Sequence, residues 1–469
     1  MRAVVLGAGP TGLMAAMLLA AEGHRVTVLD RDASPPDGDA GVVWSGWKRP
    51  GVNQFHHTHC LLPGGLHMLA AEVPAIVDRL IGLGGRRHNM IGGAWGVGQV
   101  GGREPEDDRF GTVAVRRPLL EAAVLAEAEQ TAGVTLRRGV RVIGLLTEAG
   151  TAGQPHVTGV RTGDGELAAD LVVDASGRNS QVTAMLAAIG AEPHEQRAEV
   201  GFRYYTRFFR SADGVLPRRL PWPNQHHDSL TVLTAPGDSG TWSVTLATSG
   251  RDQELRGLGH NDAWQRALAL YPAAAHWGDG EPITNVTAMG GTESRYRSFV
   301  VDGRPVATGI VALGDAWATI NPQFGTGMTM GFRHAALLRN TLRMVGVEDP
   351  VEFAVRFHAA TEHNLSPVWT SFAAWDGHRF AEIDAEMRGE VYTTDDPAWN
   401  LQIALDTARR HAPDVLRALA DVACMLTTTE EALAKPGPLE KILELGAGAP
   451  RYPDPGPTRA ELLSALTRD

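Results

Sequence analysis

Short apolar runs flank one longer apolar segment within the first thirty residues. Residues 3–6 and 25–29 are short runs rich in β-branched side chains, and residues 10–22 are apolar on most sides. Strands that are apolar on both faces belong inside a parallel sheet, and Gly23 suits the left-handed turn that ends a helix. This pattern predicts a strand, a helix and a second strand of one parallel sheet.

Further along the chain, the hydrophobic pattern indicates two kinds of sheet. Residues 171–174 and 309–313 have the composition of buried strands, and each is followed by a polar turn or loop. Between them, aromatic segments with alternating polarity are separated by Pro and Gly turns, as expected of a mainly antiparallel sheet. The other predicted elements are helices over 117–132 and from the loop at 322–327 to 342, and strands at 135–146, 157–161, 201–209 and 241–247.

After residue 345 the pattern becomes helical. We predict helices over 406–425 and 428–445, then a Gly- and Pro-rich linker over 446–457 before a final short helix. The fold class is therefore α/β: a Rossmann-like domain with an inserted, mainly antiparallel sheet and a C-terminal helical region.

Composition narrows the class of protein. The chain has 469 residues, of which 43% are hydrophobic and 21% charged, and these values predict a globular protein of two or three packed units. The formal net charge of −11 repels phosphate backbones, so we expect no nucleic-acid partner. Cys60 and Cys424 are too few for a disulfide framework or a metal cage, and we expect a cytoplasmic protein.

The uncharged stretch over residues 3–21 has the length of a signal or membrane-spanning segment. Gly7, Gly9, Pro10 and Gly12 interrupt it where a membrane helix would be continuous, so we predict no stable membrane insertion.

Those glycines form a dinucleotide-binding fingerprint. The sequence Gly7-Ala8-Gly9-Pro10-Thr11-Gly12 is GxGxxG between a predicted strand and a predicted helix. The first glycine permits a tight turn, the second lets a pyrophosphate approach the backbone, and the third lets the helix pack on the strand. Asp30, at the end of the second strand, is placed to bind ribose hydroxyls, with Arg31 beside it.

A second loop narrows the cofactor to a flavin. Leu313-Gly314-Asp315-Ala316 and the following NPQFGTGM sequence resemble the GD motif of FAD-dependent monooxygenases of the aromatic-hydroxylase type. The resemblance implies that Asp315 binds the ribityl chain of FAD. It further implies that the flavin ring lies beside a group of loop residues, namely Pro322, Gly325, Gly327 and Met328.

Three more segments resemble motifs of the same family. VDASGRNS over 173–180 is similar to the DG motif, which implies that Asp174 and Gly177 contact FAD and the reduced nicotinamide cofactor. RPLLE, starting at Arg117, and RPGVNQ, starting at Arg49, imply arginine contacts with the phosphates and ribose. The RPGVNQ segment, with the histidines after it, is similar to a bacterial subgroup that includes polyether-pathway epoxidases.

The histidines after Arg49 have two interpretations. His57 and His59 are candidate catalytic contacts with the flavin edge or substrate by the resemblance, or they are loop or core histidines that bond the backbone. With His56 they form a cluster, yet no Cys or carboxylate completes a four-ligand site, so we predict no metal.

The resemblance implies a domain plan and an activity. Residues 1–75, 100–190 and 300–345 would bind FAD, residues 76–99 and 191–299 would bind substrate, and residues 346–469 would be helical. The activity implied is insertion of one oxygen atom of O2 into a lipophilic alkene or aromatic natural product, through a flavin C4a-hydroperoxide. The electrons would come from NADPH or NADH, or from a separate flavin reductase.

Two alternatives stay open on the sequence. A flavin-dependent reductase of isoprenoid double bonds shares the fingerprint, and fold does not fix reaction. A non-catalytic binding protein could use the same FAD fold.

Overall fold

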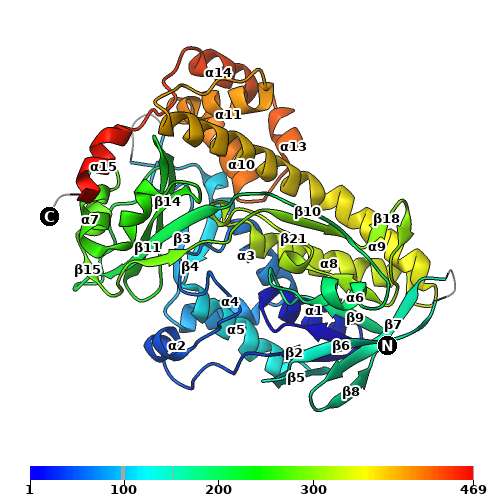
Figure 1. The fold of residues 1–469 in the computed structure, drawn as a ribbon. Coiled ribbons are helices and arrows are strands. Elements are labelled where there is room, and N and C mark those ends of the chain that lie inside the picture. Colours follow the sequence, from blue (N-terminus) through cyan, green and yellow to red (C-terminus); the bar gives the residue numbers. More distant parts are fainter. Residues whose placement is uncertain (97–100, 151–152, 468–469) are drawn as a thin grey trace.

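The computed structural model describes residues 1–96, 101–150 and 153–467 (Figure 1). The expected domain boundary at residues 99 and 100 lies outside the described residues. No helix in the described part of the chain is long and apolar enough to cross a membrane.

A parallel sheet forms the base of the molecule, as predicted. Its strands run in the order β20-β9-β1-β2-β5, and every neighbouring pair is parallel. Segments far apart in sequence therefore lie side by side, which brings their carboxyl ends to one edge of the sheet. The strands are β1 (Arg2–Leu6), β2 (Arg25–Asp30), β5 (Val134–Arg138), β9 (Leu171–Asp174) and β20 (Ile310–Ala312).

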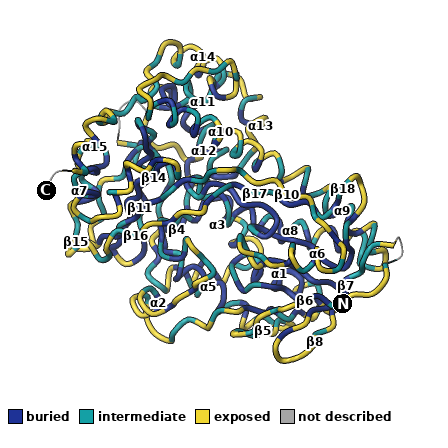
Figure 2. The backbone as a smooth tube through the Cα atoms, in the orientation of Figure 1, coloured by how far each residue is buried: buried dark blue, intermediate teal, exposed yellow. Residues whose placement is uncertain are grey.

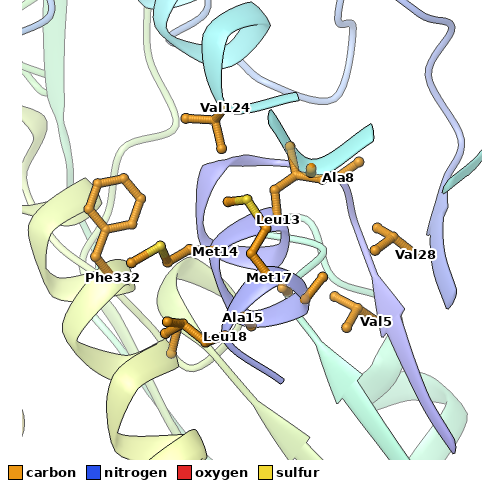
Figure 3. Close-up of a cluster of buried hydrophobic side chains, with 14 of the residues drawn as sticks. Val5, Ala8, Leu13, Met14, Ala15, Met17, Leu18, Val28, Val124 and Phe332 are labelled. Atoms are coloured by element: carbon orange, nitrogen blue, oxygen red, sulfur yellow. The ribbon is translucent and has the colours of Figure 1, made fainter. Parts of the chain in front are cut away.

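Alternate side chains of β1 enter two different cores. Val5 packs with helices α1 (Pro10–Ala21), α5 (Arg117–Gln130) and α8 (Gly327–Val345), and Figure 3 shows it near Val28 beside the α1 side chains. Val4 points to the other face and packs under the three-stranded sheet β6 (Val142–Ala149), β7 (Pro155–Thr162) and β8 (Gly165–Ala168), together with α6 (Val182–Ala187). Burial on both faces explains the unbroken apolar runs in the sequence.

The predicted antiparallel sheet is a second layer of structure. Its path is β12-β13-β14-β11-β15, with β16 also paired to β11, and Figure 2 shows β11 and β14 as mostly buried. The strands are β11 (Phe202–Arg210), β12 (Asn224–His226), β13 (Leu230–Pro236), β14 (Thr241–Ser249), β15 (Glu281–Pro282) and β16 (Thr287–Met289). Helix α7 (Asn261–Ala269) and the final helix α15 (Arg459–Thr467) share its apolar core.

The remaining elements connect and cover these sheets, and Figure 1 shows α11 and α14 together at the top of the view. The remaining helices are α2 (Ala40–Gly46), α3 (Pro63–Glu72), α4 (Ala75–Gly82), α9 (Pro350–Asn364), α10 (Ser366–Met387), α11 (Pro397–Ala408), α12 (Pro413–Ala423), α13 (Thr429–Leu433) and α14 (Pro438–Gly446). The remaining strands are β3 (Arg86–Asn89), β4 (Gly111–Ala114), β10 (His194–Arg197), β17 (Arg295–Ser298), β18 (Val300–Val301), β19 (Arg304–Pro305) and β21 (Ala318–Thr319).

Three sequence predictions were wrong in their boundaries. The strand expected over 135–146 is two strands in different sheets, because the chain turns at Gly139, where φ is +71°. The helix expected over 406–425 is interrupted before Pro413, whose ring excludes the helical conformation from the residue preceding it. The helix expected over 428–445 is likewise broken, by the Pro436-Gly437-Pro438 sequence.

The part of segment 76–99 that the structure describes contacts two parts of the molecule, and its assignment to the substrate domain stays a prediction. Ile76 and Leu80 on α4 pack in the core of the parallel sheet. Strand β3, which follows, pairs with β4, and Ile91 packs against Leu416 of α12. The segment therefore joins the base of the molecule to the C-terminal helices.

Candidate functional site

A large cavity of about 1410 Å³ is lined by residues of the parallel-sheet base, the antiparallel sheet and the C-terminal helices. The loops after β1, β2, β9 and β20 line one side, and the antiparallel sheet and α10 line the other. Such a volume exceeds what one drug-sized ligand needs, so the cavity has room for a dinucleotide and a second molecule.

The fingerprint glycines have different environments that match their expected roles. Gly7 has φ +101°, and a Cβ there would lie 2.5 Å from the carbonyl oxygen of Ala175. A Cβ at Gly12 would collide with the carbonyl oxygen of Gly7, and Gly12 does not line the cavity. A Cβ at Gly9 would meet nothing within 4 Å, although Gly9 lines the cavity together with Pro10 and Thr11. The cradle is therefore open at the one glycine where a phosphate must approach.

The second loop faces the same cavity. Asp315, Pro322, Gly325, Gly327 and Met328 all line it. Gly325 adopts φ +68°, and Gly327 is the first residue of α8, so the positive end of this helix faces the cavity. The structure thus places side by side two motifs that are some 300 residues apart in sequence.

Buried polar atoms in the second loop lack partners within the described chain. Both side-chain polar atoms of Gln323 and the hydroxyl of Thr326 have no hydrogen-bond partner, although both residues line the cavity. Because buried polar groups are nearly always hydrogen-bonded, these atoms point to a ligand that completes the site.

A charged network closes the adenosine end. The carboxylate of Asp30 accepts hydrogen bonds from the backbone N–H of Ala8 at 2.7 Å and from Nη2 of Arg49 at 2.7 Å. Glu121 accepts from Nη1 of Arg49 at 2.5 Å and from Nε of Arg117 at 2.7 Å. Burial by itself would raise the pKa of Glu121, but the two arginines lower it below its ordinary value.

Both arginines predicted to touch phosphate are therefore held by this carboxylate, and both line the cavity, as does Arg31. In the sequence Glu121 is recognisable only as an acid of the RPLLE motif on an amphipathic helix, which does not indicate that it holds two arginines.

Comparisons with known proteins agree with this geometry. A family model described as FAD dependent oxidoreductase matches residues 2–94. Protein Rv3254 of Mycobacterium tuberculosis (strain ATCC 25618 / H37Rv) is 31% identical over 403 residues, which cover 80% of each chain. The FAD-dependent monooxygenase atnJ of Arthrinium sp is 22% identical over 387 residues, covering 76% of this chain and 80% of its own. The chain belongs to one family with Rv3254, and its first ninety or so residues match the FAD-dependent oxidoreductase model.

A solved structure of the same fold supports the architecture. PqsL of Pseudomonas aeruginosa has 17% sequence identity and a TM-score of 0.59, and the match covers 83% of this chain and 98% of PqsL. The open cradle at Gly9, the helix end at Gly327 and the unsatisfied atoms of Gln323 and Thr326 all fit FAD, the cofactor named by the family model that matches residues 2–94. Which residues contact FAD stays a prediction at the level of single side chains.

Of the two residues predicted from the DG turn, Gly177 lines the cavity and Asp174 does not. Gly177 has φ +80° and lines the cavity. Asp174 does not line it, because its carboxylate accepts hydrogen bonds from the hydroxyl groups of Ser176 at 2.5 Å and Ser180 at 2.6 Å. Burial raises the pKa of Asp174, although these serines oppose the shift. Asp174 thus holds the turn together from behind, where we had expected it to contact the cofactor.

The two candidate catalytic histidines line the cavity as neutral rings. Burial lowers the pKa of His57 to about 4 and that of His59 to about 3. His57 Nδ1 is hydrogen-bonded to the hydroxyl of Thr206 at 2.9 Å, while Nδ1 of His59 has no partner within the described residues. At neutral pH neither ring carries the proton of a general acid.

Helix α10 supplies cavity-lining side chains that the sequence did not predict. Phe372 and Trp375 line the cavity, and Phe372 stacks on Phe324 of the second loop with ring centroids 4.1 Å apart. The next residue, Asp376, accepts a hydrogen bond from Nδ2 of Asn321 at 2.8 Å, and Tyr204 donates to Oδ1 of the same asparagine. The only signal in the sequence was an acid beside aromatic residues in a predicted helical region, and such a pattern does not specify a site.

Proposed function

We propose that this protein inserts one atom of O2 into a lipophilic alkene or aromatic substrate, by epoxidation or hydroxylation, using FAD reduced by NADPH or NADH. The observation that carries the proposal is the continuity of the cavity. One end has the cradle for a dinucleotide, and the other end is an apolar chamber that opens at the second loop.

The chamber is lined by side chains suited to a lipophilic molecule. Phe324, Phe372 and Trp375 make an aromatic wall, with Phe324 and Trp375 ring centroids 5.0 Å apart. The remaining apolar lining includes Leu220, Trp222, Leu233, Met289, Ile320 and Val368. Such a wall excludes water and orients a substrate beside the second loop.

The polar groups of the chamber include a set of neutral side chains at the antiparallel sheet. The hydroxyl of Thr58 is hydrogen-bonded to that of Thr245 at 2.6 Å, and Thr206 is bonded to Thr245 at 2.7 Å. With His57 they offer a neutral hydrogen-bonding strip to a substrate oxygen. Bound FAD supplies the reaction with oxygen, and these residues of the chain position the molecule that receives it.

The DG turn bears on the proposed electron source. Arg178, in this turn, lines the cavity and donates hydrogen bonds to the backbone carbonyl oxygens of Gly291 and Glu293. A nicotinamide cofactor that reduces FAD directly must reach this cavity, whereas a separate flavin reductase would make that approach unnecessary. We propose direct reduction, in a cytoplasmic protein whose Cys60 and Cys424 are free thiols.

The test uses the purified holoenzyme. We expect the flavin absorbance bands to bleach on anaerobic addition of NADPH or NADH and to return on exposure to oxygen. With a panel of aryl alkenes and phenols under ¹⁸O2, we expect one labelled atom in the product. Turnover that consumes no oxygen would support the reductase alternative, and a protein that cannot bind FAD would overturn the proposal.

A further inference from the structure

The far wall of the chamber contains a guanidinium group that no carboxylate neutralises. Arg219 lines the cavity, and among the described residues it forms no ion pair. Its one protein acceptor is the backbone carbonyl oxygen of Asn89, which receives Nη1 at 2.8 Å. Burial lowers the pKa of this arginine, and no acidic side chain opposes that shift. Nε and Nη2, the edge of the fork that binds oxyanions bidentately, have no acceptor within the described chain.

A histidine with an unsatisfied ring nitrogen lies beside this arginine. His88, on β3, lines the same part of the cavity, and its buried Nδ1 has no hydrogen-bond partner among the described residues. Burial and the charge of Arg219 together lower the pKa of His88 to about 4, and a hydrogen bond with the backbone of Arg86 opposes the shift. A nearby anion would favour a hydrogen on Nδ1, so the ring can supply a second N–H donor to it.

These two groups lie on the substrate side of the second loop. Met90 follows His88 by two residues on the chain, and its sulfur is 3.7 Å from Sγ of Cys60. Cys60 in turn contacts Gly325, since a Cβ there would lie 3.8 Å from Cβ of Cys60. The chain of contacts runs from the second loop to His88 within one cavity.

We propose that Arg219 and His88 form an anion-binding subsite, so that the substrate carries a carboxylate on its lipophilic body. This inference rests on the proposed function, because it describes the molecule that enters the same chamber. A partly buried guanidinium without a counter-ion is costly, and a planar carboxylate fits the free edge of its fork. The aromatic and aliphatic side chains of the chamber would hold the lipophilic body, so the carboxylate would fix which end of the substrate faces the second loop.

The test is a binding measurement that needs no turnover. Equilibrium dialysis of the FAD-loaded protein would compare naphthalene-2-carboxylate with naphthalene-2-carboxamide, which has the same shape and no charge. We expect the carboxylate to bind about tenfold or more tightly, because hydrogen bonds to charged groups contribute roughly 1.5–3 kcal/mol. Equal binding of the two probes, or no binding of either, would overturn the subsite.

Two variants remove the guanidinium edge in different ways. Arg219→Gln deletes the charge. Gly92→Ala keeps the charge but displaces the group, because a Cβ at position 92 would lie 2.5 Å from Nη2 of Arg219. Both variants should abolish the preference for the carboxylate while they retain FAD. If Arg219→Gln loses FAD or does not fold, the Gly92→Ala result decides.

The matched control is Arg218→Gln, since Arg218 is exposed and does not line the cavity. It should keep the preference unchanged. A preference that survives in both chamber variants, or a loss of NADPH-driven FAD reduction in them with the carboxylate preference intact, would contradict the assignment. Failure of oxygen insertion with the preference retained would instead contradict the proposed function and leave the subsite standing.

Discussion

At Gly9 a side chain would occupy only space that a ligand needs. Nothing in the protein lies within 4 Å of a Cβ at this position, so a larger side chain would project into the cavity and strain no neighbour. We predict that Gly9→Val folds normally and binds FAD at least tenfold more weakly, because the isopropyl group occupies the volume of the pyrophosphate.

The measurement for Gly9→Val is FAD affinity by fluorescence titration of the apoprotein, with the thermal midpoint of the apo form as a check on folding. Gly163→Ala, an exposed position that is also open, is the control. Gly12→Val should behave differently and unfold the domain, because its Cβ collides with the Gly7 carbonyl oxygen. Unchanged FAD affinity in Gly9→Val would contradict the cradle.

Asp315 is the carboxylate assigned to the ribityl chain. It lines the cavity beside the start of α8, with one of its oxygens 3.8 Å from where a Cβ of Gly327 would be. We predict that Asp315→Ala reduces FAD affinity by about tenfold or more, since a carboxylate that bonds hydroxyl groups contributes about 1.5–3 kcal/mol. Flavin content after gel filtration measures this, and Glu129→Ala on the exposed end of α5 is the control. Full occupancy in Asp315→Ala would refute the assignment.

For single residues, the sequence predicted which of them line the cavity better than it predicted their hydrogen-bond partners. Gly9 and Asp315 line the cavity because their motifs are local, with turn and helix start fixed by a few neighbouring residues. Arg49 and Asp174 could not be predicted in the same way. The bonds of Arg49 to Asp30 and Glu121 depend on segments that meet only in the folded chain, and Asp174 bonds local serines that compete with any ligand.

At the scale of elements, α10 ties the C-terminal region to the second loop through one buried carboxylate. Asp376 is 5% exposed, and its two oxygens accept hydrogen bonds from Asn321 and Ser294, at 2.8 and 2.9 Å. Burial raises the pKa of Asp376 from 3.8 to about 7, although both hydrogen bonds oppose the shift. The folded state therefore holds a proton that the unfolded state has released.

The consequence of this raised pKa is a loss of stability with rising pH. Between about pH 4 and pH 7 the folded protein binds more protons at this site, so its free energy of unfolding falls as pH rises, by about 1.4 kcal/mol for each unit of pKa difference. We predict that Asp376→Asn removes this slope and gains stability relative to the wild type between pH 5 and pH 8. Thermal midpoints at the two pH values measure it.

Asp384→Asn is the matched control for this prediction. Asp384 lies on the same helix, but its carboxylate is partly exposed and pairs with Arg251 at 2.7 Å. Its pH profile should follow that of the wild type. Parallel profiles for Asp376→Asn and the wild type would contradict a carboxyl that is protonated in the fold.

The elements that the sequence predicted well are those whose burial shows in their periodicity. β9 and β20 are buried on both faces and appear as unbroken apolar runs, while β11, with six of its nine residues buried, is marked by its aromatic side chains. The C-terminal helices were less predictable, because their amphipathic pattern continues through Pro413 and only the backbone chemistry of proline divides them. Nothing in the sequence pattern shows that α10 reaches the cavity, since this depends on how the helix packs.

At the scale of the whole molecule, FAD would contact all the regions of the chain that surround the cavity, namely the parallel-sheet base, the antiparallel sheet and the C-terminal helices. All three regions line the cavity, so FAD should stabilise the entire chain and not one domain. We predict that FAD at about a hundred times its Kd adds about 2.7 kcal/mol to the free energy of unfolding. Riboflavin, which lacks the pyrophosphate and adenosine, should add much less. A single thermal transition that shifts with FAD would be expected, whereas two transitions of which one shifts would show that the regions unfold separately.

Different segments of the chain line the dinucleotide end and the chamber end of the cavity, which matters for protein engineering. The dinucleotide cradle is built from loops after the parallel strands, whereas Trp222, Leu233 and Phe372 line the chamber from the inserted segment and from α10. A library of substitutions at these three chamber positions leaves every glycine and carboxylate of the cradle in place. Directed evolution can therefore retune which molecules are accepted while each variant is still screened by the yellow colour of its cofactor.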